Sequence, residues 1–228
     1  MVRQARSEVT RQKIIDAAVD LFSSRGYDAT GLGDIIGRVG VTKGALYYHF
    51  DSKDSLARAI IAEGAAALSK TFADISSAPA PAFENMIHGI FVVADLVRGD
   101  KLAGTAVYLA RALAPFGNAA SQAYDDWLRV LLAQAAQAQD QGDLRVGVDA
   151  AAIAELVLAA FLGVELVANA ASRGADLIKR LARAWDLLMP AIASPEALPY
   201  FREYLKRESM RHAGPALTID ATALEARR

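Results

Sequence analysis

The sequence contains no cysteine among its 228 residues and only three histidines. Without cysteine the chain forms neither disulfide bonds nor thiolate metal sites. His49, His88 and His212 do not have the spacing of metal ligands, so we expect no metal ion and no other cofactor. A nucleophile elbow and a Walker-type phosphate loop are also missing. We therefore expect no catalytic residues and a protein that is not an enzyme.

Long apolar runs are scarce as well. The longest uncharged apolar stretch of the C-terminal half, residues 156–164, is far shorter than the roughly 20 residues that cross a bilayer. The N-terminus is polar and basic and lacks the apolar core of a signal peptide. We expect a cytoplasmic protein without a membrane partner.

Charge of either sign is nearly balanced, with a formal net charge of −1, but it is unevenly distributed. Residues 1–58 carry nine Lys and Arg against seven Asp and Glu, and the remainder is acidic overall. A basic head on an acidic body is expected of a protein that presents one end to phosphates. Arg3 and Arg6 lie before the first apolar stripe, where they either form a DNA-contacting arm or belong to an ordinary solvated terminus.

Helical periodicity dominates the pattern, and no strand alternation is present. Apolar residues from Ile14 to Phe22 recur at helical spacing, and residues 32–39 form a second, short amphipathic stretch. Gly40 then suits a tight turn that needs a positive φ. These patterns predict an all-α chain that begins with a helix-turn-helix head of three helices.

The run VTKGALYYHF, residues 41–50, has the pattern of a recognition helix. Thr42 is a suitable N-cap, although its hydroxyl could instead donate to a phosphate. Leu46, Phe50 and their neighbours fall on a packing face, and a cation, a small residue and two phenols fall on the other. The predicted DNA contacts in and around this helix are Thr30, Thr42, Lys43, Gly44, Tyr47, Tyr48 and Lys53, together with Arg3 and Arg6.

The ordered matches over residues 7–60 resemble the DNA-binding domain of the TetR family of transcriptional regulators. They are Thr10-Arg11, Ile14, Ala17-Ala18, Leu21-Phe22, Gly26-Tyr27, Thr30, Ile35, Gly40-Val41, Leu46 to Phe50, Ser52-Lys53 and Leu56. The VTKGALYYHF run also resembles the γ-butyrolactone-receptor group within that family. Trp127 stands where that group tends to place a ligand-pocket tryptophan.

The rest of the chain reads as a larger helical body. Breaker clusters separate predicted helices at about 82–98, 101–113, 119–141, 149–172, 176–189 and 195–211. Pro195 suits a first-turn position and Ser194 a cap. We predict a DNA-binding domain over residues 1–52, a ligand-binding and dimerisation domain over 53–213, and a disordered tail over 214–228.

Apolar stripes in the body can line a pocket, although an apolar stripe at helical spacing is by default plain core. Glu165 is either solvated, at an interface, or a polar anchor inside the pocket. Trp127 offers a large stacking face and one donor, which suits a mainly apolar ligand. The predicted ligand residues are Ile90, Val93, Tyr108, Trp127, Leu131, Phe161 and Glu165.

A single recognition helix covers few base pairs, so we expect a homodimer that reads a palindromic operator in double-stranded DNA. The resemblance implies pairing through two helices of each subunit, with intrachain packing as the alternative. The predicted interface residues are Gly163, Leu177, Leu181, Trp185 and Leu188. Together these features predict a dimeric repressor that a small-molecule effector releases from its operator. The alternative is a TetR-like DNA-binding protein without an inducer, either architectural or an activator that works through protein contacts.

Overall fold

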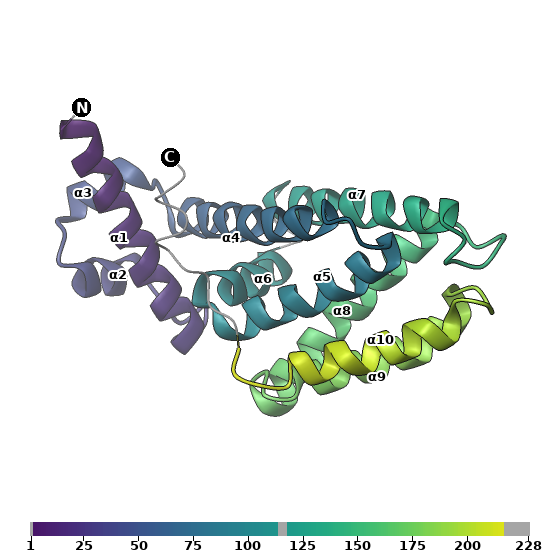
Figure 1. Ribbon diagram of the computed structural model, residues 1–228. Helices are drawn as coiled ribbons and strands as arrows, with labels where there is room; N and C mark the ends of the chain where they lie inside the picture. Colours follow the sequence, from purple (N-terminus) through teal and green to yellow (C-terminus); the bar gives the residue numbers. More distant parts are fainter. Residues whose placement is uncertain (1, 114–117, 217–228) are drawn as a thin grey trace. The chain divides into compact units, whose positions relative to one another are not determined.

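The computed structural model describes residues 2–113 and 118–216, except for the side chains of residues 2–5, 118 and 120. These ranges contain ten α-helices and no β-strand, so the predicted all-α class is confirmed (Figure 1). The helices are α1 (Val2–Arg25), α2 (Leu32–Val39), α3 (Lys43–His49), α4 (Lys53–Ser76), α5 (Ala82–Gly99), α6 (Lys101–Leu113), α7 (Asn118–Asp140), α8 (Ala150–Ser172), α9 (Leu177–Ile192) and α10 (Leu198–Arg211).

The chain divides into two compact units. One unit joins Met1–Ala67 to Lys101–Ala123, and the other joins Leu68–Asp100 to Tyr124–Arg228. The first unit therefore takes in α6 and the first part of α4 as well as the predicted head. The predicted boundary at residue 52 remains a prediction, and residues 217–228 of the predicted tail lie outside the described residues.

The head of the first unit has a small apolar core to which α1, α2, α3 and the start of α4 all contribute. Ile14 of α1, Ile35 of α2, Leu46 of α3 and Leu56 of α4 are fully buried. This is the inner face that the helical spacing predicts for each of the four segments. Gly40 adopts φ 74° at the end of α2, which only glycine adopts at little cost, so the chain turns sharply into α3.

Helix α6 is fastened to the head within the same unit. The Nζ atom of Lys101 lies 2.6 Å from Oδ1 of Asp20 on α1. The hydroxyl oxygen of Tyr108 accepts a hydrogen bond of 3.2 Å from the backbone N–H of Tyr27. The first contact holds the first turn of α6 against α1. The second contact holds the second turn of α6 against the segment that follows α1.

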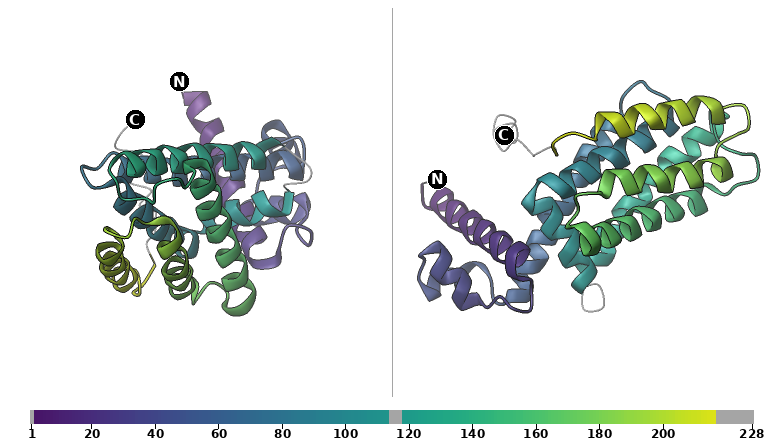
Figure 2. Two further views of the ribbon diagram at one scale, coloured as in Figure 1. Left: turned by 90° about the vertical axis from the view of Figure 1, so that its right-hand side faces the viewer. Right: turned by 90° about the horizontal axis from the view of Figure 1, so that it is seen from below.

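The second unit packs α5 against the C-terminal helices. The ring of Phe83 on α5 lies 4.6 Å from that of Phe201 on α10 and 6.0 Å from that of Trp185 on α9, measured between centroids. Helices α9 and α10 contact each other along their lengths and run side by side in different views (Figures 1 and 2). This aromatic cluster packs the start of α5 against α9 and α10.

Two predicted helix ends differ from the structure. Helix α9 continues through Pro190 to Ile192 rather than ending at residue 189. Helix α10 begins at Leu198 rather than at residue 195, because the backbone N–H of Ser194 donates to the carbonyl of Asp143 instead of entering a helix. The hydroxyl of Ser194 accepts from the N–H of Ala197, at 3.3 Å, in the turn before α10.

Helix α8 is more apolar than the count of its longest uncharged run suggests. Over Ala150–Ser172 it is long and apolar enough to cross a membrane by length and composition alone, and 33% of its most apolar window is buried within the chain. The run at residues 156–164 therefore understates the length of the apolar segment in α8. Much of the apolar surface of α8 is therefore exposed on a single copy of the chain.

Candidate functional site

Helix α3 is short and well defined at both ends. The Oγ1 atom of Thr42 accepts a hydrogen bond of 3.1 Å from the backbone N–H of Ala45, which confirms Thr42 as the N-cap. The backbone N–H of Phe50 donates to the carbonyl of Leu46 at the other end. The cap and the Gly40 turn together fix which side of α3 faces the head.

The two faces of α3 differ as the sequence predicts. Leu46 is fully buried and Phe50 is 4% exposed. Tyr47 and Tyr48 are 43% and 80% exposed, and Lys43 and Gly44 are exposed beside them. Lys43, Gly44, Tyr47 and Tyr48 are hereafter the reading face. The face offers an ammonium group and two phenols to the outside, at a position where glycine leaves the backbone accessible.

Lys43 differs from several other cations of the head in having no ion-pair partner among the described residues. Arg11, Arg38 and Arg58 of the head each form an ion pair with a carboxylate. Lys43 forms no ion pair with any described residue, and its Nζ atom lies 5.8 Å from the ring centroid of Tyr47. Its charge is therefore available to a ligand at the N-terminal end of α3.

Lys53 is less free than the sequence suggests. Its Nζ atom donates to the carbonyl of Tyr27 at 2.9 Å and lies 4.2 Å from the centroid of the Tyr27 ring. The hydroxyl of Tyr27 in turn donates to Asp54 at 2.9 Å. Burial and this hydrogen bond raise the pKa of Tyr27 to about 12. Lys53 thus joins the start of α4 to the turn after α1, and any phosphate contact would come from its remaining donors.

Of the other predicted DNA contacts, Arg3 and Arg6 lie on α1 and Thr30 is buried in the head. Arg6 is exposed on α1, and Arg3 also lies within that helix, although its side chain is outside the described residues. Both belong to a helix rather than to an extended arm. Thr30 is 1% exposed, and its hydroxyl donates to the carbonyl of Gly26 at 2.8 Å. Thr30 is therefore corrected from a DNA contact to a structural residue.

An aromatic stack marks the predicted ligand region of the second unit. The ring of Trp127 on α7 stacks on Phe161 of α8 at 6.0 Å and lies 6.2 Å from Phe72 of α4. A Cβ atom on Gly89 of α5 would come within 2.6 Å of the Phe72 ring. Glycine at that position lets α5 approach Phe72 closely. Four helices thus meet around Trp127.

A small hollow lies beside this stack. It is lined by Ser69, Phe72, Trp127, Val130 and Leu131, and the space between these side chains does not admit a water-sized sphere. Ligand pockets usually measure roughly 300–1,000 Å³. The hollow is therefore too small for such a ligand unless the rings around it move.

The remaining predicted ligand residues fall into two groups. Ile90, Val93 and Leu131 are buried in the second unit, whereas Tyr108 belongs to the first unit. Glu165 is 1% exposed and accepts a hydrogen bond of 2.7 Å from the side-chain amide of Asn169. Because Glu165 is buried in the single chain, the alternative prediction that it is solvated is wrong. It is a buried polar group on the apolar helix α8.

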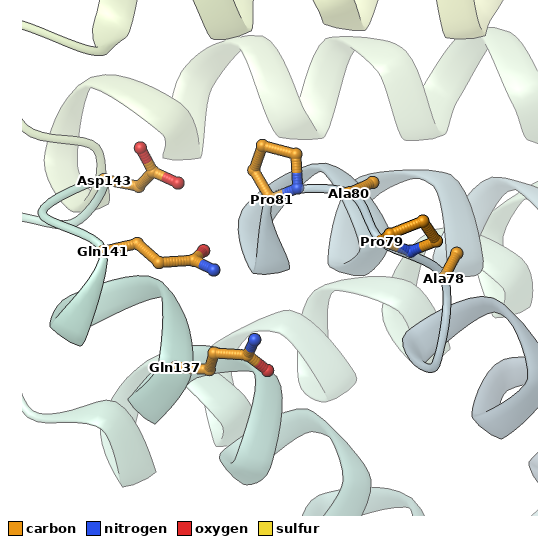
Figure 3. A pocket seen from close by; sticks show the side chains of 7 residues that line it. All are labelled: Ala78, Pro79, Ala80, Pro81, Gln137, Gln141 and Asp143. Carbon is orange, nitrogen blue, oxygen red and sulfur yellow. The ribbon is translucent and has the colours of Figure 1, made fainter.

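A larger surface hollow lies at the far ends of α4 and α7 (Figure 3). Its lining residues are Ala78, Pro79, Ala80, Pro81, Gln137, Gln141 and Asp143. The side-chain oxygen of Gln141 accepts from the N–H of Ala82 at 2.8 Å, and burial raises the pKa of Asp143. The lining combines small apolar residues with two amides and a carboxylate and contains no aromatic side chain.

Three predicted interface residues are inside the chain's own core. Leu177, Leu181 and Trp185 are each at most 2% exposed, and Trp185 packs on Phe83 of α5. These three are corrected from interface to core, because their side chains have no surface to offer a second copy. Gly163 is exposed and Leu188 is half-buried, so both remain compatible with an interface.

The opposite face of α8 and α9 is exposed and apolar. On α8 it repeats at helical spacing, and on α9 it includes Leu187, which is 80% exposed. We call this surface the α8–α9 face. It consists of Leu156, Ala159, Gly163, Leu166, Val167, Ala170, Leu187 and Ala191.

One cluster of histidine and glutamate side chains was not predicted from the sequence. His88, Glu208 and His212 bring one ligand atom each to within 4.8 Å of the others, although His88 is 120 residues from Glu208 in the sequence. The local signal was the pair Glu208 and His212, four residues apart on one helix face. The histidine spacing alone did not reveal it.

Comparisons with known proteins agree with the geometry of the head. Residues 14–60 match the sequence profile of bacterial regulatory proteins of the tetR family. Over 202 residues the chain is 29% identical to the A-factor receptor protein of Streptomyces griseus, and the alignment covers 89% of this chain and 70% of that protein.

Solved structures share the fold along most of the chain. A γ-butyrolactone receptor described as ArpA-like has a TM-score of 0.74 at 26% identity, covering 91% of this chain and 99% of that one. CprB from Streptomyces coelicolor, in complex with its biological operator sequence, has a TM-score of 0.74 at 26% identity, with 90% and 99% covered. The head, the helical body and these likenesses agree: the chain belongs to the TetR family of bacterial regulatory proteins.

Proposed function

We propose that the protein is a homodimeric transcriptional repressor that releases its operator DNA when a small, mainly apolar molecule binds in the second unit. The observation that carries the proposal is the reading face of α3. Lys43, which forms no ion pair with the described residues, and two exposed tyrosines lie on one side of a helix whose other side is held in the head by Leu46 and Phe50.

The residues of the reading face divide between two tasks. Lys43 at the N-terminal end of α3 suits guanine O6 or N7, because that end meets base edges in helix-turn-helix docking. Tyr47 and Tyr48 suit phosphates or thymine methyl groups. Lys53 and Arg6 suit phosphates, which set the orientation of the protein without reading the sequence. Thr42 acts as the cap of α3.

We propose the α8–α9 face as the dimer interface. Leu166 and Val167 are 45% and 49% exposed on a single chain, and an apolar face of this extent is unfavourable in water. Gly163 has open space around a Cβ position, which allows a second helix to approach closely. Pairing of α8 and α9 with their copies would cover the face and place two α3 helices at a spacing of about 34–36 Å, one DNA turn.

The proposed ligand is a γ-butyrolactone with an alkyl side chain. Two relatives carry names that refer to A-factor and γ-butyrolactone reception, and Trp127 lies in an apolar, aromatic site. The indole could donate one hydrogen bond to a lactone or hydroxyl oxygen while the alkyl chain displaces Phe72 and Leu131. Ile90, Val93 and Phe161 would complete the apolar wall, and Glu165 would supply a polar group.

The proposed coupling uses helices shared by both units. Helix α4 carries Lys53 of the first unit and Phe72 of the second, because the division falls at Ala67 and Leu68. A ligand that displaces Phe72 would therefore act on the helix that begins at the reading head. Moving the population from 1:99 to 99:1 requires about a 10⁴-fold preference of the ligand for the non-DNA state.

We further propose that the protein has no enzymatic activity and works in the cytoplasm, where its operator is located. The regulatory function needs no reacting group, because binding energy alone shifts the equilibrium between the two states.

Selection of bound fragments from a random DNA pool tests the DNA-binding part. The expected product is a palindrome with half-sites about one turn apart. A mobility shift on that operator, with and without a synthetic alkyl γ-butyrolactone, tests the response. Recovery of sequences without common features would contradict a sequence-specific regulator.

Reciprocity separates a true inducer from a non-specific competitor. Saturating lactone must weaken operator binding by the same factor by which the operator weakens lactone binding. A thermal-shift screen of lactones and other lipophilic metabolites that finds no stabiliser would favour the second candidate, a DNA-binding protein without an inducer.

A further inference from the structure

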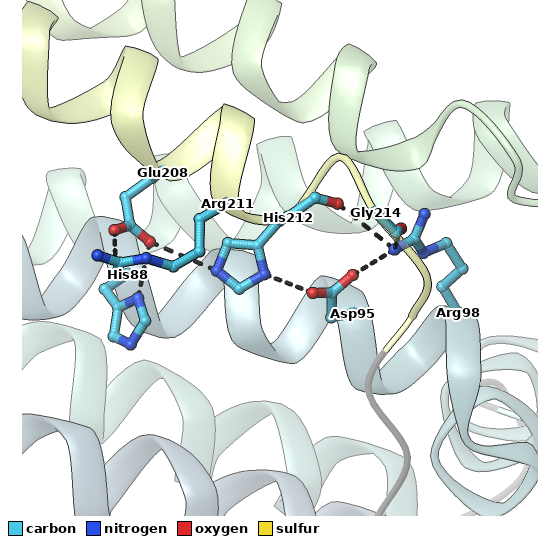
Figure 4. Close-up of polar contacts among 7 residues, drawn as sticks. All are labelled: His88, Asp95, Arg98, Glu208, Arg211, His212 and Gly214. Carbon is cyan, nitrogen blue, oxygen red and sulfur yellow. Dashed lines mark hydrogen bonds and ion pairs between the residues drawn. The ribbon is translucent and has the colours of Figure 1, made fainter.

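A buried polar cluster joins α5 to α10 in the second unit (Figure 4). His88 and Asp95 come from α5, and Glu208 and His212 come from the end of α10 and the residue after it. Glu208 and His212 are 1% and 4% exposed, so both are more than nine-tenths buried. The proposed regulator has no use for these groups, because none of them contacts the reading face or the aromatic stack.

His212 is oriented by a second residue. Its Nδ1 atom is hydrogen-bonded to Oδ2 of Asp95, and Oδ1 of Asp95 accepts from Arg98 at 2.6 Å. The opposite ring nitrogen, Nε2, is buried and makes no hydrogen bond with any described residue. It lies 3.4 Å from Oε2 of Glu208. The ring is therefore held with one nitrogen anchored and the other aimed at a carboxylate.

Glu208 stands between the two histidines. Its Oε2 atom lies 2.7 Å from Nδ1 of His88, and its Oε1 atom accepts from Arg211 at 2.6 Å. Burial raises the pKa of Glu208, but the neighbouring His212, His88 and Arg211 side chains outweigh it and lower that pKa to about 2. The carboxylate is thus ionised near neutral pH.

We propose that His88, Glu208 and His212 bind one divalent transition-metal ion, for which Zn²⁺ has the best-matched chemistry. Two imidazole nitrogens and one carboxylate oxygen are ligands that zinc takes in three-residue sites with a fourth position open to water. All three donors lie within 4.8 Å of one another. The Asp95 contact on His212 is the carboxylate–histidine pairing that usually orients a metal-bound imidazole.

Metal binding requires only a small local change. Donor atoms about 2.0–2.2 Å from a tetrahedral zinc ion are roughly 3.3–3.5 Å apart. The 3.4 Å between His212 Nε2 and Glu208 Oε2 already meets this value. The 2.7 Å between His88 Nδ1 and Glu208 Oε2 must lengthen, as the ion takes the place of the shared proton. The side chain of His88 is 28% exposed, so it has room to shift and gives the ion a route in.

The consequence is a cross-link between α5 and the C-terminal helix. An ion that binds only the folded chain stabilises it by mass action. Helix α5 would be held on one side by the ion and on the other by the contact of Gly89 with Phe72.

The experiment uses the full-length, tag-free protein after removal of metal with a chelator. Isothermal titration with Zn²⁺ is expected to give one tight site per chain and a higher melting temperature. Titration with Co²⁺ is expected to give the visible absorption of a four-coordinate ion with nitrogen and oxygen ligands. A folded protein that binds neither ion at micromolar concentration would overturn the proposal and leave the cluster as a network held by protons.

Variants locate the site. Glu208→Gln and His88→Gln are expected to weaken Zn²⁺ binding at least tenfold, and Asp95→Asn, which alters only the residue behind His212, by about 10–100-fold. Glu203→Gln is the matched control, because Glu203 is an exposed carboxylate on α10 that pairs with Lys206. His49→Gln controls for the third histidine of the chain. Unchanged affinity in Glu208→Gln and His88→Gln, with circular dichroism confirming the fold, would place the ion elsewhere and overturn the proposal.

Discussion

Gly64 of α4 faces Ala106 of α6 so closely that a Cβ atom on Gly64 would overlap the Ala106 side chain. The same Cβ atom would lie 3.2 Å from the carbonyl oxygen of Leu102. Neither neighbour is the end of a flexible side chain, so neither can rotate away. Glycine at this position therefore sets the separation of two helices that both belong to the unit carrying the reading head.

Gly64→Ala is expected to destabilise the protein. Alanine improves helix propensity by about 1 kcal/mol, but overpacking costs typically about 1–3 kcal/mol, so the net loss is up to about 2 kcal/mol. Urea unfolding measures it. The matched control is Gly37→Ala on α2, where nothing lies within 4 Å of a Cβ position, and a small gain is expected. Equal effects of the two substitutions would contradict the close approach of α6.

Lys43→Ala is expected to reduce discrimination at one base position by roughly 1–3 kcal/mol. The reason is that Lys43 is exposed at the start of α3 and forms no ion pair with the described residues. Mobility shifts on the selected operator and on a scrambled duplex measure the change. Equal losses on both duplexes would mean that Lys43 contacts phosphate instead of a base.

Lys53→Ala provides the contrast. A phosphate contact predicts weaker binding to all sequences alike and a salt dependence flatter by about one unit of slope. Because Lys53 also bonds to the Tyr27 carbonyl, the variant should in addition lower the melting temperature. This second expectation follows from the hydrogen bond to Tyr27, which could not be predicted from the sequence.

The head could be predicted nearly in full because its evidence is local. Leu46 and Phe50 on one side of α3, and Lys43 and Tyr48 on the other, follow from helical spacing alone. The Thr42 cap and the Gly40 turn depend on residue types that have few alternatives at those positions. Helix α6 was likewise located correctly, at residues 101–113, but not its attachment to the head, which depends on contacts distant in sequence.

The contacts of the body were harder to predict from the sequence. Helical periodicity shows that a stripe of side chains is buried, but it does not show which part of the protein covers that stripe. Leu177, Leu181 and Trp185 have the spacing of an interface, but all three are buried within their own chain, and Trp185 packs on Phe83 of α5. The start of α10 was missed for a similar reason. The backbone of Ser194 is held by Asp143, a contact between segments about fifty residues apart. His88 and Glu208 are farther apart still, so no spacing rule could join them.

Trp127→Phe is expected to raise the lactone concentration needed for half-release of the operator by about fivefold. Phenylalanine preserves stacking on Phe161 but removes the indole donor, and one lost hydrogen bond costs roughly 1 kcal/mol. Mobility shifts at graded lactone concentrations measure the response. Trp185→Phe is the control, since Trp185 packs on Phe83 in a different part of the unit. A response shifted by Trp185→Phe alone would place the ligand there instead.

Leu166→Glu is expected to dissociate the dimer while the subunit remains folded. The side chain is 45% exposed on a single chain, so the charge is tolerated by the monomer and buried only in the proposed interface, where an unpaired charge is costly. Sedimentation velocity measures the change. Val146→Glu, at a fully exposed loop position, should leave the mass unchanged. A dimer that persists in Leu166→Glu would require a different interface.

Asp20→Asn tests the attachment of α6 through pH. Hydrogen bonds from Lys101 and then Arg38 hold the pKa of Asp20 below its ordinary value of 3.8. A group whose pKa is lowered by folding stabilises the protein above its unfolded pKa, and this contribution is lost as the pH falls through the folded value. Wild type should therefore be more stable than Asp20→Asn at neutral pH, and the difference should narrow below about pH 4. Thermal unfolding across the acid range, in low salt because all three side chains are partly exposed, measures this difference. A gap that stays constant into strong acid would mean that the ionised carboxylate does not hold α6 to the head, and that Tyr108 and the Gly64 approach are sufficient.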